Sequence, residues 1–139
     1  MADSQEQTVA DTDLMREEVI EGLRRDQKMV PSKYFYDERG SRLFEQITRL
    51  EEYYPTRAEL DIMKRHGAEM ADLIGPGSTV IEFGSGSSKK TRYLLNELME
   101  PAGYIPVDIS ADFLMEQAEK LRREFPKIPI EPLAADYTH

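Results

Sequence analysis

From residue 78 onward, short apolar runs alternate with longer amphipathic segments, and this order limits the folds that the chain can adopt. Strands are expected over residues 78–83, 104–107 and 130–134, with one helix in each interval. Parallel strands that are joined through helices build one sheet with right-handed connections. The order therefore predicts an α/β fold, the first β-α-β-α-β half of a doubly wound parallel sheet.

Upstream of this sheet, apolar residues at helical spacing predict three helices. The first runs from about Asp13 to Arg25, the second follows Gly40, and the third ends at Gly75-Pro76-Gly77. Residues 1–12 are polar and are expected to be a frayed or disordered tail. Three parts are thus expected: the tail over 1–12, a helical segment over 13–77, and the half-sheet over 78–139.

Two helix starts have candidate capping residues. Ser41 is expected to cap the second helix, whose Leu43, Phe44 and Ile47 would then face inward. Thr56 and Glu59 match the capping box, in which each side chain bonds a backbone amide at the start of the third helix.

Each predicted strand ends in a residue type that suits ligand binding. Gly84-Ser85-Gly86 follows the first strand, Asp108 the second and Asp136-Tyr137 the third. Ligands of such sheets bind at the carboxyl ends of the strands, which share one edge. Gly84 and Gly86 allow a close backbone approach, and the next helix directs its free N–H groups at the same place. A ligand site is therefore predicted at this edge.

The spacing of these residues favours a nucleoside ligand. Asp108 lies 24 positions after Gly84 (108 − 84), close to the ~20 expected for a ribose-binding acid. The alternative is a helix-capping Asp or a solvated loop Asp. Lysine at 89 stands where a third glycine would allow pyrophosphate to approach, so a dinucleotide is disfavoured. Lys90 opposes the helix dipole, which suits either an ordinary surface lysine or a partner for a ligand carboxylate. Asp136 and Tyr137 could hold an adenine edge or form a plain loop.

Two aromatic clusters precede the sheet, and the residues alone leave their role open. In Tyr34-Phe35-Tyr36, either two rings pack and the third stays half exposed, or one ring closes over a flat ligand. In Tyr53-Tyr54, either the rings pack at a corner or one phenol meets a bound substrate.

Composition excludes several other functions. The net charge of −9 argues against nucleic acid or an anionic membrane as the main partner. The chain has no cysteine, which excludes disulfides and thiolate metal sites and suits a reducing cytoplasm. His66 and His139 are too few and too separated for a histidine metal site, so no metal is expected. No signal peptide or apolar run of ~18 residues is visible.

Four longer motifs carry a specific resemblance. They are Tyr34-Phe35-Tyr36-Asp37-Glu38-Arg39-Gly40-Ser41, Phe44-Glu45-Gln46-Ile47-Thr48-Arg49-Leu50, Glu52-Tyr53-Tyr54-Pro55-Thr56-Arg57 and Glu82-Phe83-Gly84-Ser85-Gly86-Ser87-Ser88-Lys89-Lys90-Thr91-Arg92. Together they resemble the histidine-specific S-adenosylmethionine-dependent methyltransferases, a family that includes the ergothioneine-pathway enzyme trimethylating the α-amino group of L-histidine. The likeness runs from about Val30 to Tyr137.

The resemblance implies a Rossmann-like class I methyltransferase fold, an enzyme and residue roles, and the missing cysteines agree with a cytoplasmic location. S-adenosylmethionine, and S-adenosylhomocysteine as product, would bind a set formed by Tyr36, Gly84, Gly86, Lys90, Asp108, Asp136 and Tyr137. Tyr137 stands where relatives have phenylalanine. Tyr53 would contact the amino-acid substrate, and no residue is assigned as catalytic. Relatives are about twice as long, so we expect this chain to be an N-terminal fragment that is inactive alone.

Two other functions stay open, and the oligomeric state is not predicted. The same fold could act on another amino-acid-derived amine, such as an indole amino acid. A non-catalytic half-domain could instead bind a nucleoside or a partner chain.

Overall fold

A computed structural model describes residues 2–137, with side chains from Thr12 onward, and Met1, Thr138 and His139 lie outside the described residues. The chain divides into two compact units, Met1–Tyr36 and Asp37–His139, and each is described by itself. The division falls inside the segment 13–77 that was expected to form one part. No helix among the described residues is long and apolar enough to cross a membrane.

The first unit consists of helix α1 (Ala2–Arg24) and the short 3-10 helix η1 (Ser32–Phe35). Helix α1 begins at Ala2 and so includes residues of the segment 1–12 that was predicted to be a frayed or disordered tail. Residues 2–12 include Ala, Gln and Glu, which favour helices, beside Asp, Ser, Thr and Val, which do so less. The predicted end of the helix near Arg25 is confirmed.

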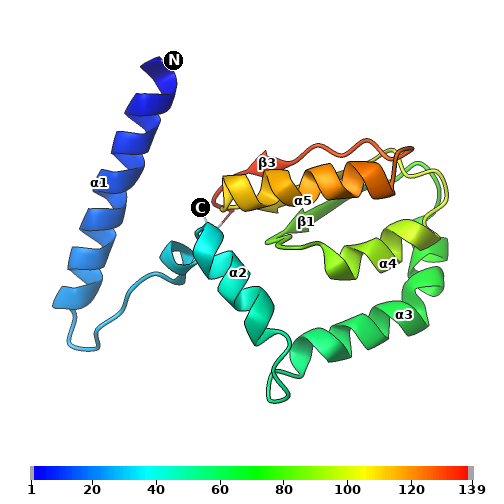
Figure 1. Cartoon of the computed structure of the whole chain (residues 1–139), viewed down its shortest axis with the longest axis horizontal. Helices are drawn as coiled ribbons and strands as arrows, with labels where there is room; N and C mark the ends of the chain where they lie inside the picture. Colours follow the sequence, from blue (N-terminus) through cyan, green and yellow to red (C-terminus); the bar gives the residue numbers. More distant parts are fainter. Residues whose placement is uncertain (1, 138–139) are drawn as a thin grey trace. The chain divides into compact units, whose positions relative to one another are not determined.

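The second unit contains four helices and a three-stranded parallel sheet of order β1-β2-β3 (Figure 1). The elements are α2 (Glu38–Ile47), α3 (Pro55–Ile74), β1 (Thr79–Phe83), α4 (Lys89–Glu97), β2 (Gly103–Asp108), α5 (Ala111–Glu124) and β3 (Leu133–Ala134). In the register, Phe83 lies beside Val107, and Val107 beside Leu133. The predicted β-α-β-α-β half-sheet is confirmed.

Strand β3 is shorter than the predicted 130–134. Ile130 makes only an isolated bridge with Tyr104, and the regular strand begins at Leu133. Pro132 lies between them and has no N–H to donate to the ladder, which explains the interruption.

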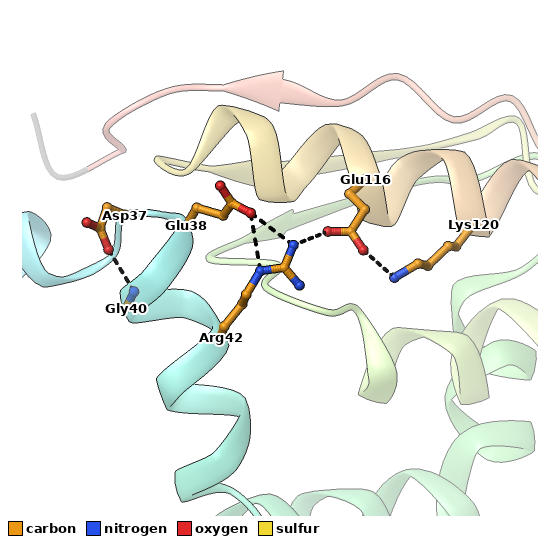
Figure 2. Close-up of polar contacts among 6 residues, drawn as sticks. All are labelled: Asp37, Glu38, Gly40, Arg42, Glu116 and Lys120. Atoms are coloured by element: carbon orange, nitrogen blue, oxygen red, sulfur yellow. Dashed lines mark hydrogen bonds and ion pairs between the residues drawn. The ribbon is translucent and has the colours of Figure 1, made fainter.

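Both capping predictions are wrong. Asp37, not Ser41, caps α2: its carboxylate accepts a 2.7 Å bond from the Gly40 amide (Figure 2). Leu43 and Ile47, which were expected to face inward, are exposed, and only Phe44 of the three is half-buried. Helix α3 starts with Pro55 at its first position, where a missing N–H costs nothing, so Thr56 lies inside the helix.

The core lies between the sheet and the helices α3, α4 and α5. Ala71, Leu95 and Leu121 each come from a different one of these helices and pack in one cluster with Tyr104 of β2. Figure 1 shows α3 and α4 running beside each other. Along β1, the side chains alternate, and Ile81 and Phe83 on the opposite face are 55% and 66% exposed.

Charged side chains link α2 to α5 at the surface. Arg42 donates 2.9 Å bonds to Glu38 of its own helix and to Glu116 of α5, and Lys120 donates a 2.7 Å bond to Glu116 (Figure 2). The bond from Lys120 lowers the pKa of Glu116, and the nearby Arg42 acts in the same direction. Exposed pairs of this kind orient helices more than they stabilise them.

Candidate functional site

The turn after β1 has a conformation that requires glycine. Gly84 and Gly86 have φ of +66° and +50°, in the left-handed region that other residues avoid. The amides of Gly84 and Ser85 both donate to the Val107 carbonyl, at 2.8 and 3.1 Å. These two bonds attach the turn to the end of β2. The turn therefore lies at the carboxyl edge of the sheet.

Asp108 links this turn to the start of α5. Its Oδ2 accepts a 2.9 Å bond from the Gly86 amide, and its Oδ1 accepts a 3.0 Å bond from the Ser110 amide. The residue is only 9% exposed. Ser110 is the N-cap of α5, so the bond from Asp108 orders the loop before the helix and does not cap the helix itself. Each carboxylate oxygen can accept a further bond, so the ribose role stays a prediction.

The third strand end meets the same turn. The Tyr137 hydroxyl lies 2.6 Å from where a Cβ at position 84 would be, so a side chain there would clash. The centroids of the Tyr137 and Phe83 rings lie 5.5 Å apart, and about half of Tyr137 is exposed. Asp136 is half-buried beside it. The structure thus brings Gly84, Gly86, Asp108 and Tyr137 together.

Lys90 lies in the first turn of α4, and its ammonium is 3.1 Å from the Glu59 carboxylate of α3. The sequence left open an ordinary surface lysine or a partner for a ligand carboxylate, and in the structure Lys90 pairs with a protein carboxylate. Both side chains are substantially exposed, so the pair is weak and can exchange for another anion.

Glu45 of α2 is a turn contact that sequence reasoning missed. It accepts a 2.6 Å bond from the Ser87 hydroxyl and a further bond from the Lys89 ammonium. Burial tends to raise the pKa of Glu45, but the bonds from Lys89 and Ser87 outweigh it, so that the pKa is lowered. No local signal links residues that lie 42 and 44 positions apart.

Ser85 is the second residue that was missed. It is 6% exposed, and its hydroxyl has no hydrogen-bond partner among the described residues. Buried polar groups are normally paired, and an unpaired one needs an explanation. This hydroxyl lies in a glycine turn just before a helix N-terminus, where it can bond a polar ligand atom.

The ligand contacts predicted for Tyr53 and Tyr36 stay predictions. Tyr53 is half-buried and packs edge-on against Phe44, with ring centroids 5.9 Å apart. Tyr36 ends the first unit, so its proximity to the glycine turn stays a prediction. No group of acidic or histidine side chains that could hold a metal ion occurs in the described part of the chain.

The unpaired Ser85 hydroxyl, the glycine turn and the acid at the next strand end fit a bound S-adenosyl nucleoside. An amino-acid-like group can use the turn amides, and ribose hydroxyls can use the remaining acceptor sites of Asp108. The three-stranded parallel sheet with its crossover helices has the order of one half of a Rossmann-like sheet.

Comparison with known proteins identifies the family. Residues 15–139 match the model of the histidine-specific, S-adenosylmethionine-dependent methyltransferases, and the chain belongs to this family. It is 41% identical to the histidine N-alpha-methyltransferase of Mycobacterium tuberculosis over 126 residues, 88% of this chain and 39% of that protein.

Two further relatives come from fungi. The ergothioneine biosynthesis protein 1 of Neurospora crassa is 40% identical over 73% of this chain and 11% of its own length. The 4-dimethylallyltryptophan N-methyltransferase of Claviceps purpurea is 33% identical over 71% of this chain and 30% of its own length. The chain thus spans well under half the length of these relatives.

Proposed function

We propose that the full-length protein is an S-adenosylmethionine-dependent N-methyltransferase that methylates the α-amino group of L-histidine, as in ergothioneine biosynthesis. The observation that carries the proposal is the glycine turn with its buried, unpaired Ser85 hydroxyl, which lies beside Asp108 and Tyr137. The name of the 41% identical relative supports histidine as the substrate. The absence of cysteine from this chain supports a cytoplasmic location.

In this proposal, the groups around the turn hold the cofactor. Gly84, Gly86 and Ser85 face its amino-acid portion, and Lys90 exchanges Glu59 for its carboxylate. Asp108 binds the ribose hydroxyls, and Asp136 and Tyr137 border the adenine. Tyr36 stays a predicted cofactor contact, and Tyr53 a predicted contact of the substrate amino acid.

When bound, S-adenosylmethionine supplies a methyl group that its sulfonium has already activated. The protein therefore contributes mainly alignment of the acceptor nitrogen with that methyl group. The amine must be deprotonated to react, so a pocket that favours the neutral amine is expected. No residue of this chain is assigned as a general base.

A second candidate substrate is an indole-containing amino acid. The similarity to the 4-dimethylallyltryptophan N-methyltransferase of Claviceps purpurea favours it, although at lower identity than the histidine enzyme. A nucleoside-binding protein without catalysis is a third candidate.

Mass spectrometry of the products separates these candidates. The full-length protein is incubated with S-adenosylmethionine and either L-histidine or L-tryptophan. We expect histidine to gain one or more methyl groups and tryptophan to remain unchanged. Methylation of tryptophan alone would overturn the histidine assignment, and methylation of neither amino acid would contradict both.

A further inference from the structure

Tyr104 of β2 is a fully buried polar residue behind the glycine turn. Its exposed fraction is 0%, and its hydroxyl bonds the Glu82 carboxylate and lies 2.9 Å from the Ser88 hydroxyl. A phenol has one proton, so Tyr104 donates to Glu82 and accepts from Ser88. One oxygen atom therefore joins two residues that lie on either side of the turn.

The two partners, Glu82 and Ser88, lie at the beginning and at the end of the glycine turn. Glu82 precedes Phe83 and Gly84 at the end of β1. Ser88 is the last residue before α4; it has a φ of +50°, which is unusual for a residue with a side chain, and it is 3% exposed. Its amide donates a 2.8 Å bond to the Ser85 carbonyl. The conformation of Ser88 thus sets how Ser85 and the helix N-terminus face each other.

Tyr104 is suited to hold this arrangement permanently. Burial raises its pKa, and the charge of Glu82 raises it further, so the phenol keeps its proton and stays a donor throughout the physiological range. The ring also packs in the core with Leu95 and Leu121, which fixes the hydroxyl in place. The oxygen is therefore a rigid point of attachment for a strained turn.

We propose that Tyr104 is a positioning residue for the cofactor: through Glu82 and Ser88, its hydroxyl holds the turn 84–88 in the conformation that binds the S-adenosyl group. The proposal rests on the proposed function for its ligand. It assigns Tyr104 no contact with the cofactor or the substrate.

The test uses Tyr104→Phe in the full-length protein, because this change removes the oxygen and keeps the ring. We expect the Kd for S-adenosylhomocysteine and the KM for S-adenosylmethionine to rise about tenfold, the loss expected from one buried charge-assisted bond. The kcat at saturating cofactor should stay within about twofold, since the reacting groups are untouched.

The control is Ile130→Val, which alters the same core cluster and leaves the three hydroxyl and carboxylate groups alone. Tyr104→Phe should raise the Kd, and Ile130→Val should lower Tm with an unchanged Kd. If Tyr104→Phe behaves like the control, with a lower Tm and an unchanged Kd, Tyr104 is a packing residue and the proposal is overturned.

Amide hydrogen exchange separates this proposal from the proposed function, because it needs no ligand. Tyr104→Phe should accelerate exchange in a peptide that covers 84–88 and leave a peptide from α5 unchanged. Equal exchange in the two proteins would overturn the proposal even if the wild type binds cofactor. If the wild type binds neither cofactor form, the proposed function fails, and faster exchange at 84–88 would still support the role of Tyr104 in shaping the turn.

Discussion

At the scale of single residues, most polar groups around the glycine turn have hydrogen-bond partners within the described part of the chain, and one has none. Asp108 uses both oxygens on backbone amides, and Glu45 uses both on the side chains of Ser87 and Lys89. Ser85 alone keeps an unpaired buried hydroxyl among the described residues. The paired groups fix the turn, and we expect the unpaired hydroxyl of Ser85 to bond a ligand once one is bound.

Ser85→Ala should therefore separate stability from binding. The hydroxyl gains no bond in the free protein, so its removal should leave stability unchanged or raise it by up to about 1 kcal/mol. Affinity for S-adenosylhomocysteine should fall by about 1 kcal/mol, the usual contribution of one hydrogen bond. Thermal unfolding and calorimetric titration measure the two effects.

Ser87→Ala is the matched control, because the neighbouring serine donates a 2.6 Å bond to Glu45. It should lower the unfolding free energy, which Ser85→Ala should not. A loss of stability in Ser85→Ala that equals the loss in Ser87→Ala would show that Ser85 has a protein partner.

At the scale of elements, Glu45 links α2 to the glycine turn, and its pKa shift predicts that this link stabilises the fold less at acid pH. The pKa of Glu45 is lowered from an ordinary 4.5, so its contribution to stability is present above that value. It is lost as the pH falls through the lower pKa of the folded state. Urea unfolding between about pH 3 and 6 should show this loss, and Glu45→Gln should flatten the acid slope. An unchanged slope in the variant would mean that Glu45 has no lowered pKa.

Shortening a side chain should lower the free energy of unfolding more on one face of the sheet than on the other. Leu121 of α5 is 0% exposed in the core cluster, so Leu121→Ala should cost about 2–5 kcal/mol. Ile81 on the opposite face is 55% exposed, and Ile81→Ala in this chain should cost less than about 1 kcal/mol. Chemical denaturation of the two variants measures the difference. Equal losses would mean that the Ile81 face is covered.

At the scale of the whole molecule, the alternating pattern from residue 78 predicted the fold because it is repeated over many residues. This pattern made it possible to predict three strands, their order along the chain and the glycine turn. Single residues at helix starts were not: Asp37 and Ser41 are both good caps, and only the structure distinguishes them.

The site was predictable only in part, for a related reason. Gly84, Gly86 and Asp108 lie at strand ends, and the topology of a parallel sheet brings these ends together. The pairs of Glu45 with Ser87 and of Lys90 with Glu59 depend on how α2 and α3 pack on α4, which no local pattern encodes. The unpaired hydroxyl of Ser85 is likewise visible only after the surrounding residues are placed.

The central claim is that the edge formed by Gly84, Gly86 and Asp108 binds an S-adenosyl nucleoside. Calorimetric titration of S-adenosylhomocysteine into the full-length protein and its Asp108→Ala variant tests it most directly. We expect one site in the wild type and an affinity loss of about 1.5–3 kcal/mol in the variant, since charge-assisted bonds to the ribose are removed. Absence of binding heat in the wild type, or equal affinity in the two proteins, would contradict the account.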